Sequence, residues 1–135
     1  MTTLAPTEFT SLIQAAIATA KHAYVPYSNY QVGAALRALD GSVYTGCNVE
    51  NAAYPSCICA ERTALVKAVS EGHRQFDVIA VVTRNGGSPC GTCRQMLFEF
   101  APDLQVIIAD LEGQVHAQHA LHELLLLGFG PSKLG

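Results

Sequence analysis

Hydrophobic residues recur every three or four positions in four stretches of the chain, the spacing that places side chains on one face of a helix. The first stretch covers about residues 7–24, and its apolar positions are Phe9, Leu12, Ile13, Ala16, Ile17 and Ala20. It ends before Pro26, because the residue that precedes a proline avoids the helical conformation. The other three helices are expected at Cys59–Val69, Cys90–Phe100 and Leu121–Leu127. In the second helix we expect Leu65, Val66 and Val69 to face inward.

A different pattern predicts the strands. Hydrophobic and other residues alternate over Val32–Ala38, which is typical of a half-buried strand, and Asp40-Gly41 then predicts a hairpin turn. Two nearly continuous apolar runs indicate strands that are covered on both faces. The strands expected after the hairpin turn are therefore Val43–Cys47, Phe76–Thr83, Leu104–Ala109 and a short one at Gln114–Ala117.

The order of these elements is α-β-β-α-β-α-β-β-α, and its middle contains two β-α-β crossovers. Crossovers of this kind place helices on the faces of a sheet with parallel strands. We therefore predict an α/β fold with three layers, α/β/α, around a mixed five-stranded sheet. The length of 135 residues predicts a single domain that spans residues 1–135.

Composition and charge narrow the classes of partner. The net charge is −3 and no stretch concentrates Lys or Arg, so nucleic acid is not expected to be a partner. Charged residues make up 14% of the chain, against about 25% in an average domain, and this low value favours a homo-oligomer. The chain begins MTTLAPTEFT, with no basic segment before an apolar one, and it has no apolar run of membrane-spanning length. We expect a cytoplasmic protein without a membrane partner.

Five cysteines cannot all pair within one chain, and clustered thiols in a cytosolic protein indicate a metal or catalysis. Cys59 begins one crossover helix, whereas Cys90 and Cys93 begin the next. Helices that follow neighbouring parallel strands begin at the same edge of the sheet, so these three thiols can converge. Each also lies at the positive end of a helix dipole, which favours the thiolate. Three thiolates on Zn²⁺ leave a fourth position open, as in a catalytic zinc site.

Two neighbours of Cys59 fit this chemistry. Glu61 lies in the first turn of the same helix, where its carboxylate can take a proton from a zinc-bound water and return it to a substrate. Arg62 follows directly, and its positive charge offsets the excess negative charge of three thiolates. Such a glutamate, which is not itself a ligand, is a known feature of zinc deaminases.

Other interpretations of the same residues remain. Cys57 allows a closed four-cysteine structural zinc site, although Glu61 would then have no role. The segment Pro89-Cys90-Gly91-Thr92-Cys93 also resembles a thioredoxin-like redox motif, and the thiols could simply be buried. His116, His119 and His122 recur every three residues, but they span a strand-to-helix change and are expected at the solvated surface.

Several longer segments resemble one family, the small homotetrameric cytidine deaminases. They are GCNVENAAYPSCICAERTA (46–64), KAVSEG (67–72), SPCGTCRQ (88–95), YVPYSNYQVGAAL (24–36) and HELLLLGFGPSKL (122–134). The resemblance extends over nearly the whole chain. It implies a cytidine deaminase-like fold of the cytidine/deoxycytidylate deaminase family. The implied activity is hydrolytic deamination of cytidine and deoxycytidine to uridine and deoxyuridine by a zinc-activated water, in pyrimidine salvage. It implies no organic cofactor.

The resemblance also implies roles for individual residues. Cys59, Cys90 and Cys93 bind zinc, and Glu61 transfers protons. Asn48 and Glu50 bind the ribose hydroxyls, while Tyr30 and Ala60 line the substrate pocket. Phe129 reaches the base in the site of a neighbouring subunit of the tetramer. Tyr30 stands where the family usually has Phe, and Leu126 stands where its C-terminal segment usually has Pro.

There are three alternatives to this activity: two other kinds of deaminase and one non-enzymatic protein. A deaminase for another cytosine-containing nucleoside, such as blasticidin S, also carries Cys-Ala-Glu, but the NVEN segment and the aromatic Phe129 favour cytidine. Deaminases that edit polynucleotides usually have His-x-Glu and need a basic surface. A zinc-stabilised binding module is the non-enzymatic alternative.

Overall fold

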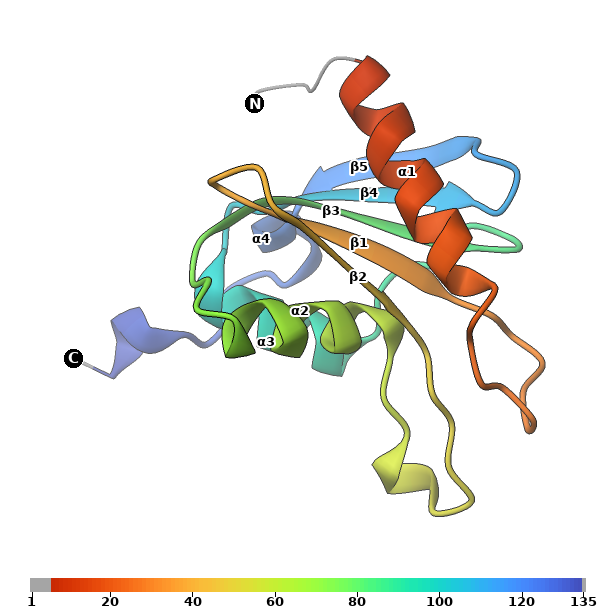
Figure 1. Cartoon of the computed structure of the whole chain (residues 1–135). Helices are drawn as coiled ribbons and strands as arrows, with labels where there is room; N and C mark the ends of the chain where they lie inside the picture. Colours follow the sequence, from red (N-terminus) through yellow and green to blue (C-terminus); the bar gives the residue numbers. More distant parts are fainter. Residues whose placement is uncertain (1–5, 135) are drawn as a thin grey trace.

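The computed structural model describes residues 6–134 and contains one five-stranded sheet with helices on both faces (Figure 1). Residues 1–5 and 135 lie outside this description, as do the side chains of residues 6–9, Phe9 among them. In chain order the helices are α1 (Pro6–Ala20), α2 (Ala60–Ser70), α3 (Gly91–Phe100) and α4 (Leu121–Leu124). The strands are β1 (Gly33–Ala38), β2 (Val43–Cys47), β3 (Phe76–Thr83), β4 (Gln105–Asp110) and β5 (Val115–Ala120). Two short 3₁₀ turns lie at Tyr54–Ser56 and Pro131–Lys133.

The sheet has the strand order β2-β1-β3-β4-β5. β3 and β4 are parallel, and every other neighbouring pair is antiparallel. Because β2 and β3 are both antiparallel to β1, they run in the same direction with β1 between them. The mixed five-stranded sheet with two crossovers, β2-α2-β3 and β3-α3-β4, is therefore confirmed.

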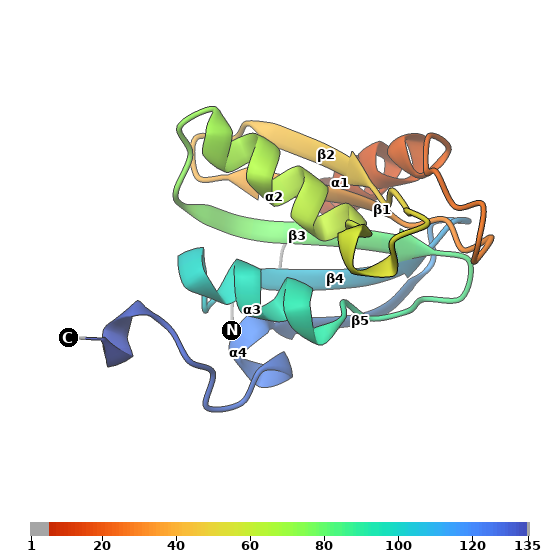
Figure 2. The same cartoon turned by 90° about the horizontal axis from the view of Figure 1, so that it is seen from below.

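Each face of the sheet has its own hydrophobic core. α1 covers one face alone, and it packs Leu12, Ile13, Ala16 and Ala20 against the side chains of β1, β3 and β4. α2 and α3 lie side by side on the other face, around a second cluster that includes Leu65 and Leu97 (Figure 2). These are the three layers that the sequence predicts, and they leave the central strands β1, β3 and β4 almost completely buried.

The close packing of α2 on the sheet depends on Gly46 of β2, which has no side chain. A Cβ atom on Gly46 of β2 would lie 2.5 Å from the Ala60 carbonyl oxygen and 2.6 Å from the Ala64 amide nitrogen. The first turns of α2 therefore rest directly on the β2 backbone. This contact fixes the position of the helix that begins at the metal-ligand candidate Cys59.

Three sequence predictions about helices are wrong in detail. The last helix ends at Leu124 rather than Leu127, and Leu127 has a left-handed backbone with φ of 55° and is fully exposed. In α2, Val66 is half exposed, because the inward stripe consists of Ala60, Ala64, Leu65 and Ala68, spaced as one helical face. The first helix is also shorter than expected and ends at Ala20.

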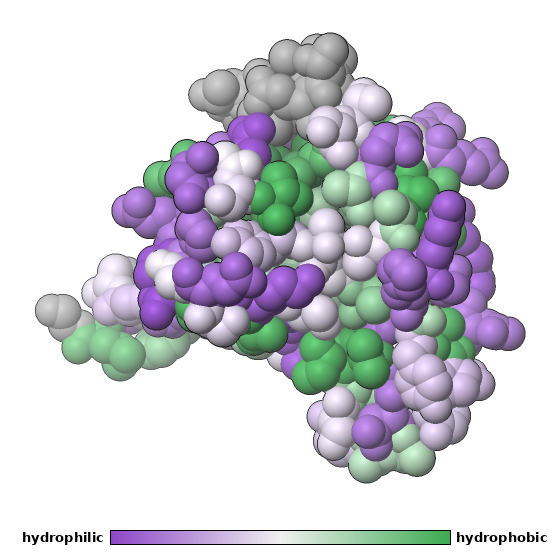
Figure 3. Space-filling view, in the orientation of Figure 1, coloured by the Kyte–Doolittle hydropathy of each residue, from purple (hydrophilic) through white to green (hydrophobic). Residues whose placement is uncertain are grey.

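Exposed hydrophobic side chains are concentrated in the segments outside the regular elements. In the C-terminal segment Leu126, Phe129 and Leu134 are 79%, 56% and 79% exposed, and the end of that segment forms a hydrophobic projection at the left of Figure 3. Across residues 6–134, none of the helices combines the length and the apolar character that a membrane span requires.

Candidate active site

The three predicted metal ligands meet at one edge of the sheet. Cys59 immediately precedes α2, Cys90 immediately precedes α3, and Cys93 lies in the first turn of α3. The sequence argument assumed that the preceding strands are neighbours, and this assumption is wrong, because β1 separates β2 from β3. The thiols still converge because both strands end at the same edge and the segment between Cys47 and Cys59 crosses over to α2 (Figure 2).

The sulfur atoms are spaced as ligands of one ion. Sγ of Cys59 lies 3.7 Å from Sγ of Cys90, which lies 3.5 Å from Sγ of Cys93, and all three lie within 4.8 Å of one another. Tetrahedral zinc with bonds of about 2.3 Å to sulfur requires sulfur atoms about 3.8 Å apart. The donor set therefore fits Zn²⁺, with three ligands and a fourth position left for water or substrate.

Cys57 does not belong to this cluster. Its Sγ accepts a hydrogen bond from the Asn51 backbone amide at 3.3 Å and lies 3.7 Å from the Asn51 carbonyl oxygen. The thiol is thus held within its own loop, and it is absent from the cluster of potential ligands found among the described residues. This arrangement argues against the four-cysteine structural site.

A positive charge lies beside the thiols. Nη2 of Arg62 donates to Sγ of Cys59 at 3.5 Å and to the Cys57 carbonyl at 3.3 Å. Hydrogen bonding from Cys93, followed by the interaction with Arg62, lowers the pKa of Cys59 to about 5. The hydrogen bond with Cys59, together with burial, raises the pKa of Cys93. A thiolate is the form that binds metal.

Glu61 is buried in the first turn of α2, with 4% of its surface exposed. Burial is the main reason that its pKa rises to about 7, and the nearby Cys59 acts in the same direction. A carboxyl group with a pKa near neutrality can both accept and release a proton at physiological pH. Its position and pKa therefore suit a general acid–base.

A pocket of about 430 Å³ opens beside the thiols. Three segments form its walls: residues 28–32 before β1, residues 48–61 after β2, and residues 81–90, which include the end of β3. Among the residues predicted from the sequence, the lining includes Tyr30, Asn48, Glu50, Cys59, Ala60, Glu61 and Cys90. Cys93 is completely buried beside them.

Glu50 is held in place by the segment that precedes β1. Its Oε1 accepts from the backbone amides of Tyr27 and Ser28 at 3.0 and 3.1 Å, and its Oε2 accepts from the Ser28 hydroxyl. The Ser28 hydrogen bond is the main reason that the pKa of Glu50 is lowered, which keeps the carboxylate ionised. A carboxylate accepts about four hydrogen bonds, so it retains capacity for a substrate hydroxyl.

Asn48 is held in a similar way. Its Oδ1 accepts from the Val32 amide at 2.9 Å, and its Nδ2 donates to the Tyr30 carbonyl at 2.8 Å. The amide group retains one N–H and one lone pair. Asn48 and Glu50 thus each have an unused hydrogen-bonding position on the pocket wall.

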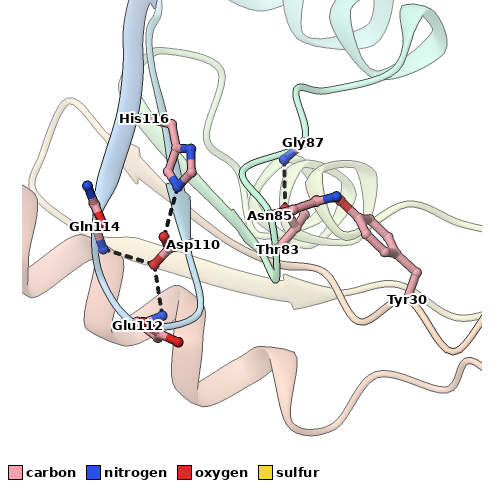
Figure 4. A network of polar contacts seen from close by, with 8 residues as sticks. All are labelled: Tyr30, Thr83, Asn85, Gly87, Asp110, Glu112, Gln114 and His116. Carbon is pink, nitrogen blue, oxygen red and sulfur yellow. Dashed lines mark hydrogen bonds and ion pairs between the residues drawn. The ribbon is translucent and has the colours of Figure 1, made fainter.

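Phe129 and the three histidines lie away from this pocket. Phe129 is not among the residues that line it, and its carbonyl oxygen accepts from Nε2 of Gln95 at 2.8 Å. His116, His119 and His122 are exposed, as expected, and none belongs to a metal-ligand cluster within residues 6–134. Nε2 of His116 lies 2.8 Å from Asp110 (Figure 4), whereas Nδ1 of His122 lies 3.3 Å from Asp103.

Five polar or small residues of the site were not predicted from the sequence. Four of them line the pocket and the fifth, Asn85, contacts Tyr30; the set is Ser28, Thr83, Asn85, Gly87 and Ser88. One of these residues, Thr83, could have been predicted from the sequence. Thr83 is the single polar residue that ends the apolar run of β3, at the carboxyl end of a parallel strand, where ligand sites form.

Fold and site together define a class: an α/β/α protein with three thiols at two helix N-termini, a buried carboxylate beside them and a pocket in front. Comparison with known proteins agrees with this class. Residues 7–109 match the family model described as "Cytidine and deoxycytidylate deaminase zinc-binding region". The chain therefore belongs to the cytidine and deoxycytidylate deaminase family.

Individual relatives support the assignment. The chain is 52% identical over 107 residues to a cytidine deaminase of Halalkalibacterium halodurans, covering 77% of this chain and 81% of that one. It is 52% identical over 98 residues to the cytidine deaminase of Sporosarcina psychrophila, covering 70% and 72%. The crystal structure of a cytidine deaminase from Burkholderia pseudomallei superposes with a TM-score of 0.83 at 48% identity, covering 88% of this chain and 97% of that one.

Proposed function

We propose that this protein catalyses the hydrolytic deamination of cytidine and deoxycytidine to uridine and deoxyuridine. The observation that carries the proposal is the cluster of Cys59, Cys90 and Cys93, which has the sulfur spacing of a zinc site and faces a pocket that contains a buried carboxylate. The similarity to proteins named cytidine deaminases supports this substrate. We propose that the protein is a cytoplasmic enzyme and that it acts in pyrimidine salvage.

The three cysteines would hold Zn²⁺, and Arg62 would balance part of their negative charge. Zinc bound in such a site lowers the pKa of water and so supplies the nucleophile. Arg62 contacts Cys59, the thiol whose pKa is lowered to about 5, so its charge lies next to a thiolate.

Glu61 would transfer the protons. It takes a proton from the attacking water, whose oxygen bonds to the ring carbon that carries the amino group. Glu61 delivers this proton to the ring nitrogen, then takes the second proton from the hydroxyl group newly formed on the ring carbon and delivers it to the amino group. The carbon–nitrogen bond breaks and ammonia leaves, so that cytidine and water become uridine and ammonia. A carboxyl with a pKa near 7 suits both halves of this exchange.

Asn48 and Glu50 would recognise the ribose, and Tyr30 and Ala60 would line the pocket around the nucleoside. The unused hydrogen-bonding positions of Asn48 and Glu50 belong to the same wall of the pocket. A free base would leave them without partners. Such unsatisfied polar groups select strongly against a substrate that lacks the hydroxyls.

We further propose a homotetramer in which Phe129 reaches the site of a neighbouring subunit. Phe129 is 56% exposed, lies outside the lining of its own pocket, and belongs to a segment with the exposed residues Leu126 and Leu134. Measurement of the mass by sedimentation equilibrium tests this arrangement. A monomer would contradict both the tetramer and the role of Phe129.

The activity is tested by ammonia release from the metal-analysed protein with cytidine, and with cytosine and adenosine as controls. We expect release from cytidine alone. Glu61→Gln should retain zinc and fold but lose about 10²- to 10⁴-fold in kcat, the usual contribution of a general acid–base. Substantial activity in Glu61→Gln would refute the proton-transfer role. Disulfide reduction without zinc would instead favour the redox interpretation.

A further inference from the structure

Two walls of the pocket are joined by a hydrogen bond between side chains far apart in the sequence. The Tyr30 hydroxyl, in the segment before β1, donates to Oδ1 of Asn85 at 2.6 Å, in the segment between β3 and α3 (Figure 4). We propose that this contact, the Tyr30–Asn85 bridge, makes Tyr30 a positioning residue that sets the affinity for the nucleoside.

The acceptor end of the bridge belongs to a consistent hydrogen-bond chain. The Gly87 amide donates to Oγ1 of Thr83 at 2.7 Å, and the Thr83 hydroxyl lies 3.4 Å from Oδ1 of Asn85 (Figure 4). Thr83 can therefore accept from Gly87 and donate to Asn85. The Asn85 oxygen has two lone pairs, one for Thr83 and one for Tyr30.

The Tyr30 ring is closely packed at this position. The Arg84 guanidinium lies 4.9 Å from the centre of the ring. A Cβ atom on Gly87 would lie 2.6 Å from the Tyr30 hydroxyl oxygen, so the absence of a side chain there is what admits the hydroxyl. The hydroxyl thus lies directly against Gly87.

The other end of the bridge reaches the ribose-binding candidates. The Tyr30 amide donates to Oγ of Ser28 at 3.0 Å, and Ser28 donates to Glu50. The Tyr30 carbonyl accepts from Nδ2 of Asn48. Hydrogen bonds therefore run from Glu50 and Asn48 through Tyr30 to Asn85, in the segment that leads to Cys90.

This path has a consequence for substrate binding, which rests on the proposed function. Asn48 and Glu50 would hold the ribose, and Cys90 would help to hold the metal at the reacting end of the nucleoside. The Tyr30–Asn85 bridge fixes the separation of these two ends before the substrate arrives. Without the bridge, part of the binding free energy is needed to order the walls.

Tyr30→Phe removes the hydroxyl but keeps the ring beside Arg84. We expect it to raise KM for cytidine about five-fold, the equivalent of one net hydrogen bond, with kcat changed less than two-fold. Asn85→Leu should have the same effect, and the double variant should be no worse than either single one. Asn85→Asp keeps the acceptor and should remain near wild type. Tyr24→Phe, at an exposed tyrosine outside the pocket, is the matched control.

Hydrogen exchange of residues 84–89 gives a readout that needs no substrate. The Gly87 amide should exchange faster in Tyr30→Phe and Asn85→Leu, and not in Tyr24→Phe. Unchanged KM and exchange in Tyr30→Phe, or an additive effect near 25-fold in the double variant, would overturn the proposal. Faster exchange in a protein that does not deaminate cytidine would support the bridge while refuting the proposed function.

Discussion

Gly46→Ala should weaken both the fold and the metal site. The new Cβ would lie 2.5 Å from the Ala60 carbonyl oxygen and 2.6 Å from the Ala64 amide, whereas ordinary contacts begin at 3.4 Å. Because these atoms are backbone, no side chain can rotate away, and the start of α2 must move by roughly 0.9 Å. Overpacking of this kind costs about 2–3 kcal/mol. A loss of that size lowers Tm by on the order of 10 °C for a domain of this length.

The displacement also reaches Cys59, which immediately precedes α2. Metal–ligand distances tolerate shifts of only about 0.2 Å, so zinc affinity should fall together with stability. Urea unfolding measures the free energy of unfolding, and competition with a chelator measures the affinity. Gly91→Ala is the matched control, since no atom lies within 4 Å of its new Cβ and its helical position favours alanine. An unfolding midpoint for Gly46→Ala equal to that of wild type would refute the packing argument.

Two further predictions concern single groups. Cys57→Ser should leave the zinc content of the purified protein unchanged, because the Cys57 thiol is held by Asn51 outside the cluster; loss of metal would restore the four-cysteine interpretation. Asp110 accepts from His116 and from two backbone amides of the β4–β5 turn (Figure 4), and the His116 hydrogen bond is the main reason that its pKa is lowered. The stability that wild type gains over Asp110→Asn should therefore be complete above about pH 4 and decline as the pH falls towards the folded-state pKa. Urea unfolding of both proteins from pH 7 to pH 3 measures this difference, and a difference independent of pH would contradict it.

The elements that sequence could predict are those whose signal is local. Burial on both faces leaves β3 a continuous apolar run, and its bounds, Phe76–Thr83, agree with the prediction. The prediction for Leu124–Leu127 was wrong because four consecutive leucines have no periodicity, so nothing in the sequence marks the end of the helix at Leu124. The position of β1 between β2 and β3 depends on pairing between distant segments, which no local pattern records.

The residues of the site also divide into those that the sequence could predict and those that it could not. Cys59, Glu61, Cys90 and Cys93 could be predicted because their chemistry is unusual and their spacing places them at helix starts. Asn85 could not be predicted, because its role depends on Tyr30, 55 residues away in the chain. Contacts of this kind exist only after the loops of different strands have been brought to one edge of the sheet.

The distribution of the three thiols has a consequence for folding as well as for chemistry. Cys59 and Cys90 lie 31 residues apart in the chain, each at the start of a different helix. An ion held by both closes a loop that includes all of α2 and β3, and so restricts the unfolded chain as a disulfide would. Closure of a loop of this length is worth about 4 kcal/mol in the chain-entropy model. A bound metal would then act as a reversible cross-link, and the protein's resistance to unfolding would depend on the zinc available to it.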